Sequence, residues 1–197
     1  METLAIVDEH TGAPTGLLMN RKAALDLKAW CMSTNIFVLN SKGQILCHKR
    51  SKEKERFPGM WFTHLGGHVG HEETYLSNAV KELEEEMGLK ISAKELTPWR
   101  TTKNDHSRLW IREFVTVQDL DIRDLTPQPG EVDEFDWKYL DEIISEQKSY
   151  PELWKAGTYD LWTEYHCMMS VLTVLHNKGF DKMPPHLLTW GAAPEAV

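Results

Sequence analysis

The chain has 197 residues, which is enough for one domain with a full hydrophobic core. Its composition, with 41% hydrophobic and 26% charged residues, is that of an ordinary globular protein and argues against intrinsic disorder. The formal net charge of −8 argues against a general nucleic-acid binder, because such proteins normally carry a basic surplus. A phosphorylated small molecule is compatible with this charge, since metal ions and a few local cations can offset both partners.

The sequence shows no sign of a membrane span or of a disulfide framework. Its longest apolar stretches, such as Ile36–Leu39 and Met168–Leu172, are far too short to cross a bilayer. Residues Met1–Leu4 lack the basic start and the apolar run of a secretory signal. The three cysteines have no CxxC spacing and cannot all pair; they are Cys31, Cys47 and Cys167. We therefore expect free thiols in a reducing compartment, and a cytoplasmic location.

The expected elements are strands on both sides of one central helix, with further helices after them. In chain order they are a strand Leu4–Val7, a turn-rich stretch His10–Gly16, a helix Arg21–Lys28, strands Thr34–Leu39 and Gln44–Lys49 around the hairpin turn Asn40–Gly43, an extended stretch Met60–Val69, a helix Glu72–Met87, strands Leu96–Thr102 and Leu109–Val117, an acidic loop Asp119–Glu131, a short strand Phe135–Trp137, and helices Leu140–Glu146 and Leu161–His176. Gly88 is the left-handed residue expected to end the central helix.

These elements predict one domain with additions at both ends. We expect an N-terminal extension at residues 1–33, a central domain at 34–150, a C-terminal helix of the same domain within 151–180, and a tail at 181–197. Because strands flank the central helix and another helix follows them, the expected fold class is α/β (α+β). Its expected architecture is an α/β/α sandwich with a mixed β-sheet.

The central helix carries the clearest candidate chemistry. Residues three and four apart lie on one face of a helix, so Glu82, Glu85 and Glu86 project their carboxylates to a common side. Like charges so placed repel each other unless something neutralises them. Hard oxygen ligands suit Mg²⁺ or Mn²⁺, and a metal held there could polarise a phosphoryl group and activate water. The alternative from the carboxylates alone is an ordinary solvated acidic face, as expected for Glu84, which points away.

The same segment resembles the Nudix box, written G-x5-E-x7-R-E-U-x-E-E-x-G-U, with U a bulky apolar residue. The positions in register are Gly67, Glu73, Glu82, Leu83, Glu85, Glu86, Gly88 and Leu89. The single departure is Lys81, where the family has an arginine that orients a glutamate. Lysine keeps the charge but loses the planar two-pronged donor, so that glutamate is expected to be held more loosely.

The resemblance implies a Nudix-type fold and a set of roles for these residues. Glu82, Glu85 and Glu86 would be metal ligands, and one of them, or a carboxylate elsewhere, would be the catalytic base. The carbonyl of Gly67 or of Gly66 is a further candidate ligand. Glu73 would be a supporting acid near the loop. Mg²⁺ or Mn²⁺ is the implied cofactor.

The resemblance extends beyond the box to type I isopentenyl diphosphate isomerase and its hydrolase relatives, over about residues 3–145. It rests on the patterns Val7-Asp8-Glu9…Gly12…Gly16…Arg21 and Ile45-Leu46…Lys49-Arg50-Ser51…Lys54…Phe57-Pro58-Gly59-Met60-Trp61…Gly66-Gly67-His68. By this resemblance Arg50 and Lys54 would hold a substrate diphosphate. The alternative is that both belong to an ordinary solvated loop of alternating lysine and glutamate.

Isomerase chemistry needs a cysteine and a glutamate on opposite faces of the substrate for proton transfer. The position that resemblance assigns to the cysteine reads Gly66, and this chain has the full set of box glutamates that the isomerase lacks. Both differences favour hydrolysis. Glu113 aligns with the isomerase's catalytic, metal-binding glutamate; the alternative is a strand carboxylate paired with Arg112 or Arg108. His68 is expected to contact phosphate, with a structural role as the alternative.

Three functions therefore stay open. The leading one is metal-dependent hydrolysis of a small-molecule diphosphate, such as a nucleoside diphosphate derivative. The second is a non-catalytic domain that senses a phosphorylated ligand, which the substitution at Lys81 keeps open. The third is an enzyme similar to isopentenyl diphosphate isomerase. Neither a nucleic-acid nor a membrane partner is expected; a homodimer is compatible with the sequence, which does not fix the oligomeric state.

Overall fold

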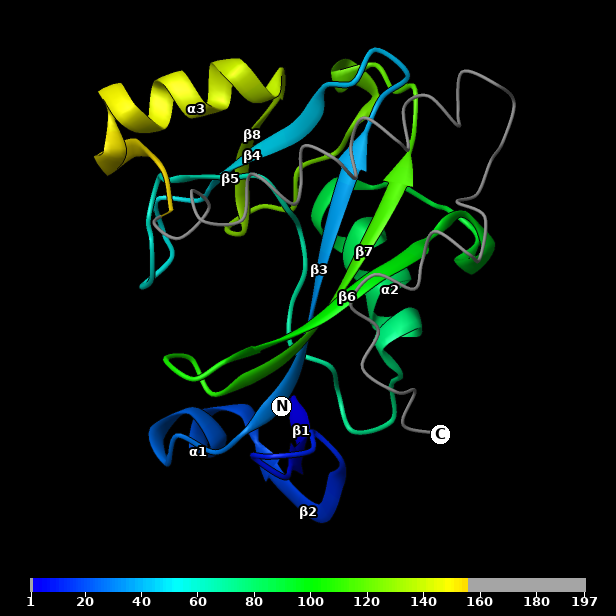
Figure 1. The fold of residues 1–197 in the computed structure, drawn as a ribbon, viewed down its shortest axis with the longest axis vertical. Coiled ribbons are helices and arrows are strands. Elements are labelled where there is room, and N and C mark those ends of the chain that lie inside the picture. Colours follow the sequence, from blue (N-terminus) through cyan, green and yellow to red (C-terminus); the bar gives the residue numbers. More distant parts are fainter. Residues whose placement is uncertain (1, 156–197) are drawn as a thin grey trace.

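The computed structural model describes residues 2–155, shown as the coloured ribbon in Figure 1. The expected helix Leu161–His176 and the tail 181–197 lie outside the described residues. Within the described part of the chain, no helix is long and apolar enough to cross a membrane.

Eight strands of the described chain form one mixed sheet. They are β1 (Thr3–Val7), β2 (Pro14–Asn20), β3 (Cys31–Leu39), β4 (Ile45–Arg50), β5 (Trp61–Phe62), β6 (Thr97–Asn104), β7 (Leu109–Val117) and β8 (Val132–Lys138). The helices are α1 (Arg21–Asp26), α2 (Tyr75–Met87) and α3 (Leu140–Ser149), with short 3-10 helices at η1 (Ala93–Glu95), η2 (Ile122–Asp124) and η3 (Pro151–Leu153). The path β2-β1-β3-β4-β5 is extended by β7 on β3, β6 on β7, and β8 on β4. Only the β3–β7 pair of these is parallel.

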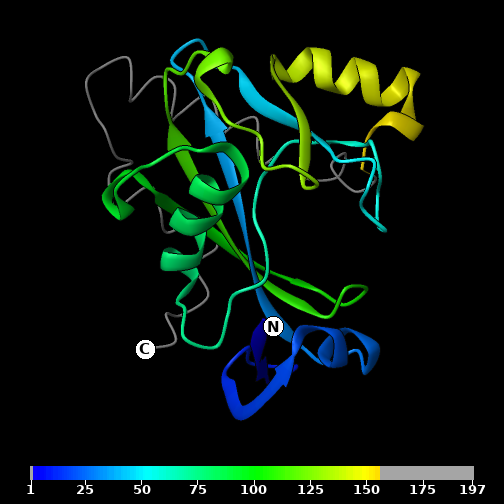
Figure 2. The same ribbon diagram turned by 180° about the vertical axis from the view of Figure 1, so that it is seen from behind.

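The α/β/α sandwich with a mixed sheet is confirmed. Successive residues of a strand face opposite sides, and on β3 both sides are apolar. Ile36 and Val38 pack with Leu83 of α2. Phe37 of the same strand packs on the other side with Ile143 of α3. Helix α2 accordingly lies behind β3 and β7 in Figure 1 and in front of them in Figure 2.

Two expectations for individual elements were wrong. The turn expected within His10–Gly16 is present at residues 9–11, but the strand β2, which begins at Pro14, was not predicted. It is almost fully exposed and, among the described strands, pairs only with β1, so it lacks apolar alternation. Helix α2 begins at Tyr75 and not at Glu72, because Thr74 caps it. The Thr74 hydroxyl accepts from the Ser77 amide at 3.1 Å, and the Ser77 hydroxyl accepts from the Thr74 amide at 2.9 Å. The helix ends as expected before Gly88, which has a φ of 74°.

A glycine-bearing segment beside β3 sets up the functional region. β3 and β4 pair at Leu39 and Ile45 and share no further paired residues. Residues 65–69 run along β3 in the space so opened: the Ile36 amide donates to the Leu65 carbonyl at 2.8 Å, and the Thr34 amide donates to the Gly67 carbonyl at 2.9 Å. This pairing brings the glycines next to the side of α2 that carries its glutamates.

Candidate active site

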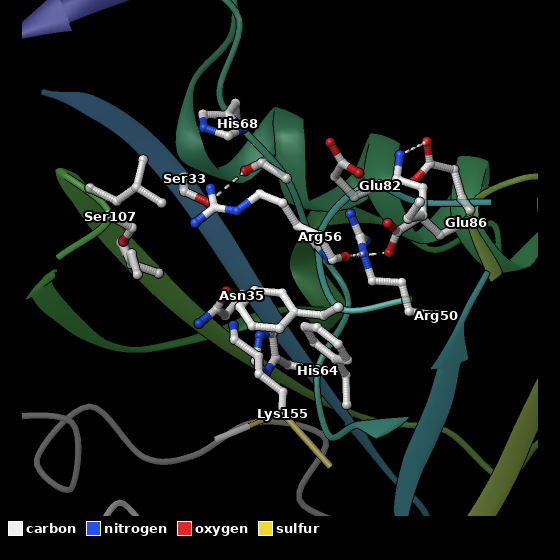
Figure 3. A pocket seen from close by; sticks show the side chains of 18 of the residues that line it. Ser33, Asn35, Arg50, Arg56, His64, His68, Glu82, Glu86, Ser107 and Lys155 are labelled. Carbon is white, nitrogen blue, oxygen red and sulfur yellow. Dashed lines mark hydrogen bonds and ion pairs between the residues drawn. The ribbon is translucent and has the colours of Figure 1, made fainter. Parts of the chain in front are cut away.

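A cavity of about 640 Å³ lies beside this segment. Its lining includes the carboxylates Glu82, Glu85, Glu86 and Glu131, the cations Arg21, Arg50, Lys54, Arg56, Lys81 and Lys155, and the polar residues Ser33, Asn35, His48, His64 and His68. Figure 3 shows Glu82 and Glu86 on α2 with Arg50 beside them, and Asn35, His64 and Lys155 farther along the cavity. The cavity therefore has an acidic end and a cationic end.

The acidic end holds desolvated carboxylates. Glu86 is only 8% exposed and accepts a hydrogen bond from the Gly66 amide at 3.2 Å. Burial and the neighbouring Glu82 raise the pKa of Glu86 to about 8. Burial and the nearby Glu85 raise the pKa of Glu82 to about 7. Without a cation, these groups resist ionisation.

Gly67 is needed for close approach to these carboxylates, and Gly66 for close approach to the backbone of Thr34. A β-carbon on Gly67 would lie 2.5 Å from a Glu82 carboxylate oxygen. The Gly67 carbonyl already accepts two hydrogen bonds of 2.9 Å, from the Ser33 hydroxyl and the Thr34 amide. The Gly66 carbonyl accepts none within residues 2–155. Of the two carbonyls considered from the sequence, that of Gly66 is the less engaged.

Lys81 and Glu73 form the support of this end. The Lys81 ammonium lies 2.7 Å from one oxygen of Glu73. The other oxygen of Glu73 accepts from the Gly70 amide at 2.9 Å and from the Asn78 side chain at 3.1 Å. The lysine therefore links the helix to the loop through one ion pair. An arginine at this position could donate two parallel hydrogen bonds.

The two cations expected to hold diphosphate differ in their surroundings. Lys54 is bound to Glu131 at 2.6 Å. Arg50 donates from its Nε atom to the Arg56 carbonyl at 3.0 Å and forms no ion pair with a carboxylate of residues 2–155. Arg50 is therefore the more available of the two for a ligand anion.

His68 lines the cavity, and its Nε2 atom is buried without a hydrogen-bond partner among the described residues. Burial and the nearby Arg21 lower the pKa of His68 to about 4, so its imidazole is neutral near pH 7. A neutral imidazole can still donate one hydrogen bond to a phosphate oxygen.

Glu113 lies apart from the α2 carboxylates. It is 2% exposed on β7 and accepts a hydrogen bond from the Arg100 Nε atom at 2.7 Å. It pairs across the strands with Asn35, which lines the cavity, but Glu113 is not among the described lining residues. The buried arginine neutralises it without a metal, and its catalytic role stays a prediction.

The acidic end fits a divalent cation by its chemistry. Within residues 2–155, no three carboxylate, imidazole or thiol side chains converge tightly enough to enclose an ion as they stand. Mg²⁺ commonly retains waters and shares phosphate oxygens, so it does not need a complete protein cage. Two buried carboxylates with raised pKa values and an unengaged carbonyl nearby are donors that a hard cation would stabilise.

Arg56, Lys155 and Asn35 were not found from the sequence. Arg56 follows a run of alternating lysine and glutamate that gave no sign of which cation turns inward. Lys155 reaches the cavity only because the chain returns after α3. The sequence predicts that Asn35 lies in a strand, but not that it lines the cavity, because its position there depends on the pairing of β3.

Comparisons with known proteins agree with this fold. Residues 30–158 match the family model described as the NUDIX domain. Over 156 residues the chain is 26% identical to an isopentenyl-diphosphate Delta-isomerase of Kocuria rhizophila, covering 76% of this chain and 84% of that protein. Over 118 residues it is 30% identical to an uncharacterized Nudix hydrolase of Pseudomonas aeruginosa, covering 60% of this chain and 68% of that protein. A crystal structure from Deinococcus radiodurans matches with a TM-score of 0.68 at 23% identity, covering 81% of this chain and 96% of that one.

Proposed function

This chain belongs to the NUDIX domain family, and from that premise we propose that it hydrolyses a diphosphate linkage in a phosphorylated small molecule with Mg²⁺ or Mn²⁺. One observation carries the proposal. The buried carboxylates of α2 share one cavity with the Arg50 guanidinium, which forms no ion pair with a carboxylate of the described chain. The negative charge of a diphosphate would offset the Arg50 guanidinium, and the positive charge of its metal would offset the α2 carboxylates.

The residues that would hold the metal are Glu82, Glu85 and Glu86, with the Gly66 carbonyl. When bound, the metal would polarise the phosphoryl group and lower the pKa of the attacking water. Arg50, which lies beside these glutamates, would bind the diphosphate oxygens, to which a guanidinium can donate two parallel hydrogen bonds. Glu73 and Lys81 would fix the position of the loop relative to α2.

The reaction proposed for these residues is a single displacement at phosphorus. The oxygen of a water forms a bond to one phosphorus, and the bond from that phosphorus to the bridging oxygen breaks. The bridging oxygen leaves with the other phosphate. One of the α2 glutamates takes the proton of the water, and Arg50 stabilises the charge that develops on the phosphate oxygens.

Conservative variants of the glutamates test this proposal. Glu85→Gln and Glu86→Gln remove a charge and keep the shape, so turnover of diphosphates with Mg²⁺ or Mn²⁺ should fall by about a thousandfold or more. Glu84→Gln is the matched control on the same helix, because Glu84 is half exposed and lies 3.2 Å from Lys90 at the surface. Unchanged rates in the first two variants, or an equal loss in the control, would contradict the assignment.

Isomerisation of a prenyl diphosphate is the second candidate, because a relative matched over most of the chain carries that name. The structure shows whether the cysteine that isomerase chemistry needs could stand at position 66. Gly66 has a φ of 136°, and a β-carbon there would overlap the Thr34 carbonyl oxygen, so no cysteine side chain fits at this position. Cys31 and Cys47 are buried and are not among the described lining residues.

A single incubation separates these candidates. With isopentenyl diphosphate and Mg²⁺, an isomerase would form dimethylallyl diphosphate, whereas a hydrolase would release phosphate or leave the compound unchanged. A panel of nucleoside and sugar diphosphates assayed in parallel identifies hydrolysis. Tight binding without turnover across that panel would favour the ligand-sensing alternative.

A further inference from the structure

The cationic end of the cavity is built from segments that the hydrolytic reaction does not use. Trp154 is 2% exposed and packs against Trp61 with ring centroids 6.2 Å apart. The Lys155 amide donates to the Trp61 carbonyl at 3.1 Å. In extended backbone, neighbouring side chains point to opposite sides. Burial of Trp154 therefore directs Lys155 into the cavity, where Figure 3 shows it near Asn35 and His64.

The Lys155 ammonium sits in an aromatic and cationic environment. It lies 4.9 Å from the ring centroid of Phe62 and 5.8 Å from that of Phe57. These are cation–π distances, at which the electron-rich ring faces stabilise the charge of the ammonium group. Burial and the positive charges of Arg50 and Arg56 lower the pKa of Lys155. The positive charges of Arg50 and Arg56 therefore oppose the protonated form of Lys155.

Arg56 is presented by a strained turn. The next residue, Phe57, has a φ of 56°, which is unusual for a bulky side chain. Two hydrogen bonds close the turn: the Arg50 amide donates to the Met60 carbonyl, and the Gly59 amide donates to the Arg50 carbonyl. In Figure 3 the Arg56 side chain extends into the cavity toward Ser33. No carboxylate within residues 2–155 forms an ion pair with Arg56.

The surroundings of these cations offer hydrogen-bond donors and hold neutral imidazoles. His48 is 4% exposed, lines the cavity, and its Nδ1 atom has no hydrogen-bond partner among the described residues. Burial, with Arg50 and Lys155 nearby, lowers the pKa of His48 to about 3. Burial and Lys155 likewise hold the pKa of His64 well below its usual range. Both rings stay neutral near pH 7 and can donate a hydrogen bond without adding to the repulsion.

We propose that Arg56, Lys155 and the amide of Asn35 form a second anion subsite, which binds a phosphate group on the part of the substrate beyond the scissile diphosphate. This position of the subsite rests on the proposed function, which assigns the scissile diphosphate to Arg50 and α2. Gathering like charges in a partly buried cavity is unfavourable unless a ligand offsets them. Guanidinium, ammonium and amide donors together match the several acceptor oxygens of a phosphate monoester. The substrate class is therefore a diphosphate with a further, distal phosphate.

Binding of inorganic phosphate to the metal-free full chain tests the subsite by itself. In EDTA no metal can recruit phosphate to the α2 carboxylates, so calorimetric titration should report phosphate bound by the cations of the cavity, and the variants of Lys155 and Arg56 separate the subsite from Arg50. Lys155→Met and Arg56→Gln should each weaken this binding by about tenfold. Lys52→Met is the matched control, since Lys52 is exposed and is not among the lining residues. Absence of phosphate binding in EDTA, or equal binding in all variants, would overturn the subsite.

A matched pair of diphosphates tests its role in substrate choice. Coenzyme A and its dephospho form share one diphosphate and differ by one distal phosphate; NADPH and NADH form a second such pair. The member with the distal phosphate should have a KM lower by about tenfold, and Lys155→Met should abolish the difference while kcat changes little. Hydrolysis of both members without preference would overturn the subsite and leave the hydrolase proposal standing. Phosphate binding that depends on Lys155, without turnover of any diphosphate, would support the subsite and count against the hydrolase.

Discussion

The two ends of the cavity both gather like charges, but the chain assembles them differently. Glu82, Glu85 and Glu86 come from two adjacent turns of α2, so their spacing is fixed by the helix itself. Arg56 and Lys155 come from a strained turn and from the segment after α3, and only tertiary packing brings them together. The acidic end therefore depends on local structure and on the glycines that approach it. The cationic end depends on long-range contacts such as the Trp61–Trp154 pair.

The difference also has an electrostatic consequence. Burial raises the pKa values of Glu82 and Glu86 and lowers that of Lys155. At each end, therefore, the surroundings disfavour the charged form of the groups. A metal would relieve the first end and an anion the second. We expect each ligand to stabilise the protein against unfolding by binding the folded state alone.

The largest expected effect comes from Gly66→Ala, which breaks the acidic end through the backbone. A β-carbon there would overlap the Thr34 carbonyl, and the φ of 136° is accessible essentially only to glycine. We expect a loss of about 3 kcal/mol or more in the free energy of unfolding, measured by urea denaturation. Gly67→Ala is the comparison, because its obstacle is the mobile Glu82 side chain. It should fold and lose activity; equal stability of the two variants would contradict this reading.

The second effect is a pH-dependent loss of stability in the metal-free protein. The folded pKa of Glu86, about 8, lies above its ordinary value of 4.5. The folded state thus keeps a proton that the unfolded state has released, and stability falls as pH rises through the folded value. Between about pH 6.5 and about pH 8.5 in EDTA, unfolding should become easier by about 2 kcal/mol.

Two controls check this origin. Glu86→Gln should reduce the pH dependence to the smaller part that Glu82, with a pKa of about 7, contributes. Mg²⁺ should restore stability to the unmodified chain at the higher pH more than to Glu86→Gln. A pH profile that is the same in both proteins would assign the effect to other groups.

Beside the acidic end, Arg50→Gln should impair substrate binding with little cost to folding. Charged hydrogen bonds contribute about 1.5–3 kcal/mol, so KM should rise by about tenfold or more. The melting temperature should hold or rise, because the positive charges of Arg50 and Lys155 oppose each other. Lys54→Gln should raise KM less, since Glu131 already binds Lys54 at 2.6 Å. The reverse order of the two variants would reassign the diphosphate contact to Lys54.

The contrast between the two ends also explains how far the sequence alone could lead. The apolar run of β3 and the capping of α2 by Gly88 are local signals, and they predicted the sandwich and the end of the helix. The start of α2 was placed too early because Glu72 and Glu73 favour a first helical turn, whereas the reciprocal Thr74 and Ser77 hydrogen bonds select the later start.

The carboxylate cluster could be proposed from spacing, because a helix converts spacing into proximity. The partners of Lys54 and Glu113 could not. Glu131 reaches Lys54 from a loop 77 positions away, and Arg100 reaches Glu113 from the neighbouring strand β6. Such pairs are set by strand register and loop path, and no short motif encodes them. The inward direction of Lys155 depends in the same way on a buried tryptophan.

The smallest effect concerns Lys81, the one departure from the family pattern. Its ammonium binds a single Glu73 oxygen at 2.7 Å, while the Gly70 amide and Asn78 hold the other. Lys81→Met removes that ion pair and a positive charge near Glu82 and Glu85, so we expect kcat to fall by about threefold to tenfold and stability to change by less than about 1 kcal/mol.

Lys81→Arg tests whether the lysine limits this chain. An arginine could bind the same oxygen and still offer a second donor to a neighbouring carboxylate such as Glu82 or Glu85, which both lie close enough to influence the pKa of Lys81. We expect kcat to change by less than about threefold. A large gain in kcat would mean that Glu73 is poorly held in the present chain. No change in either variant would mean that the Gly70 amide and Asn78 position Glu73 without help from residue 81.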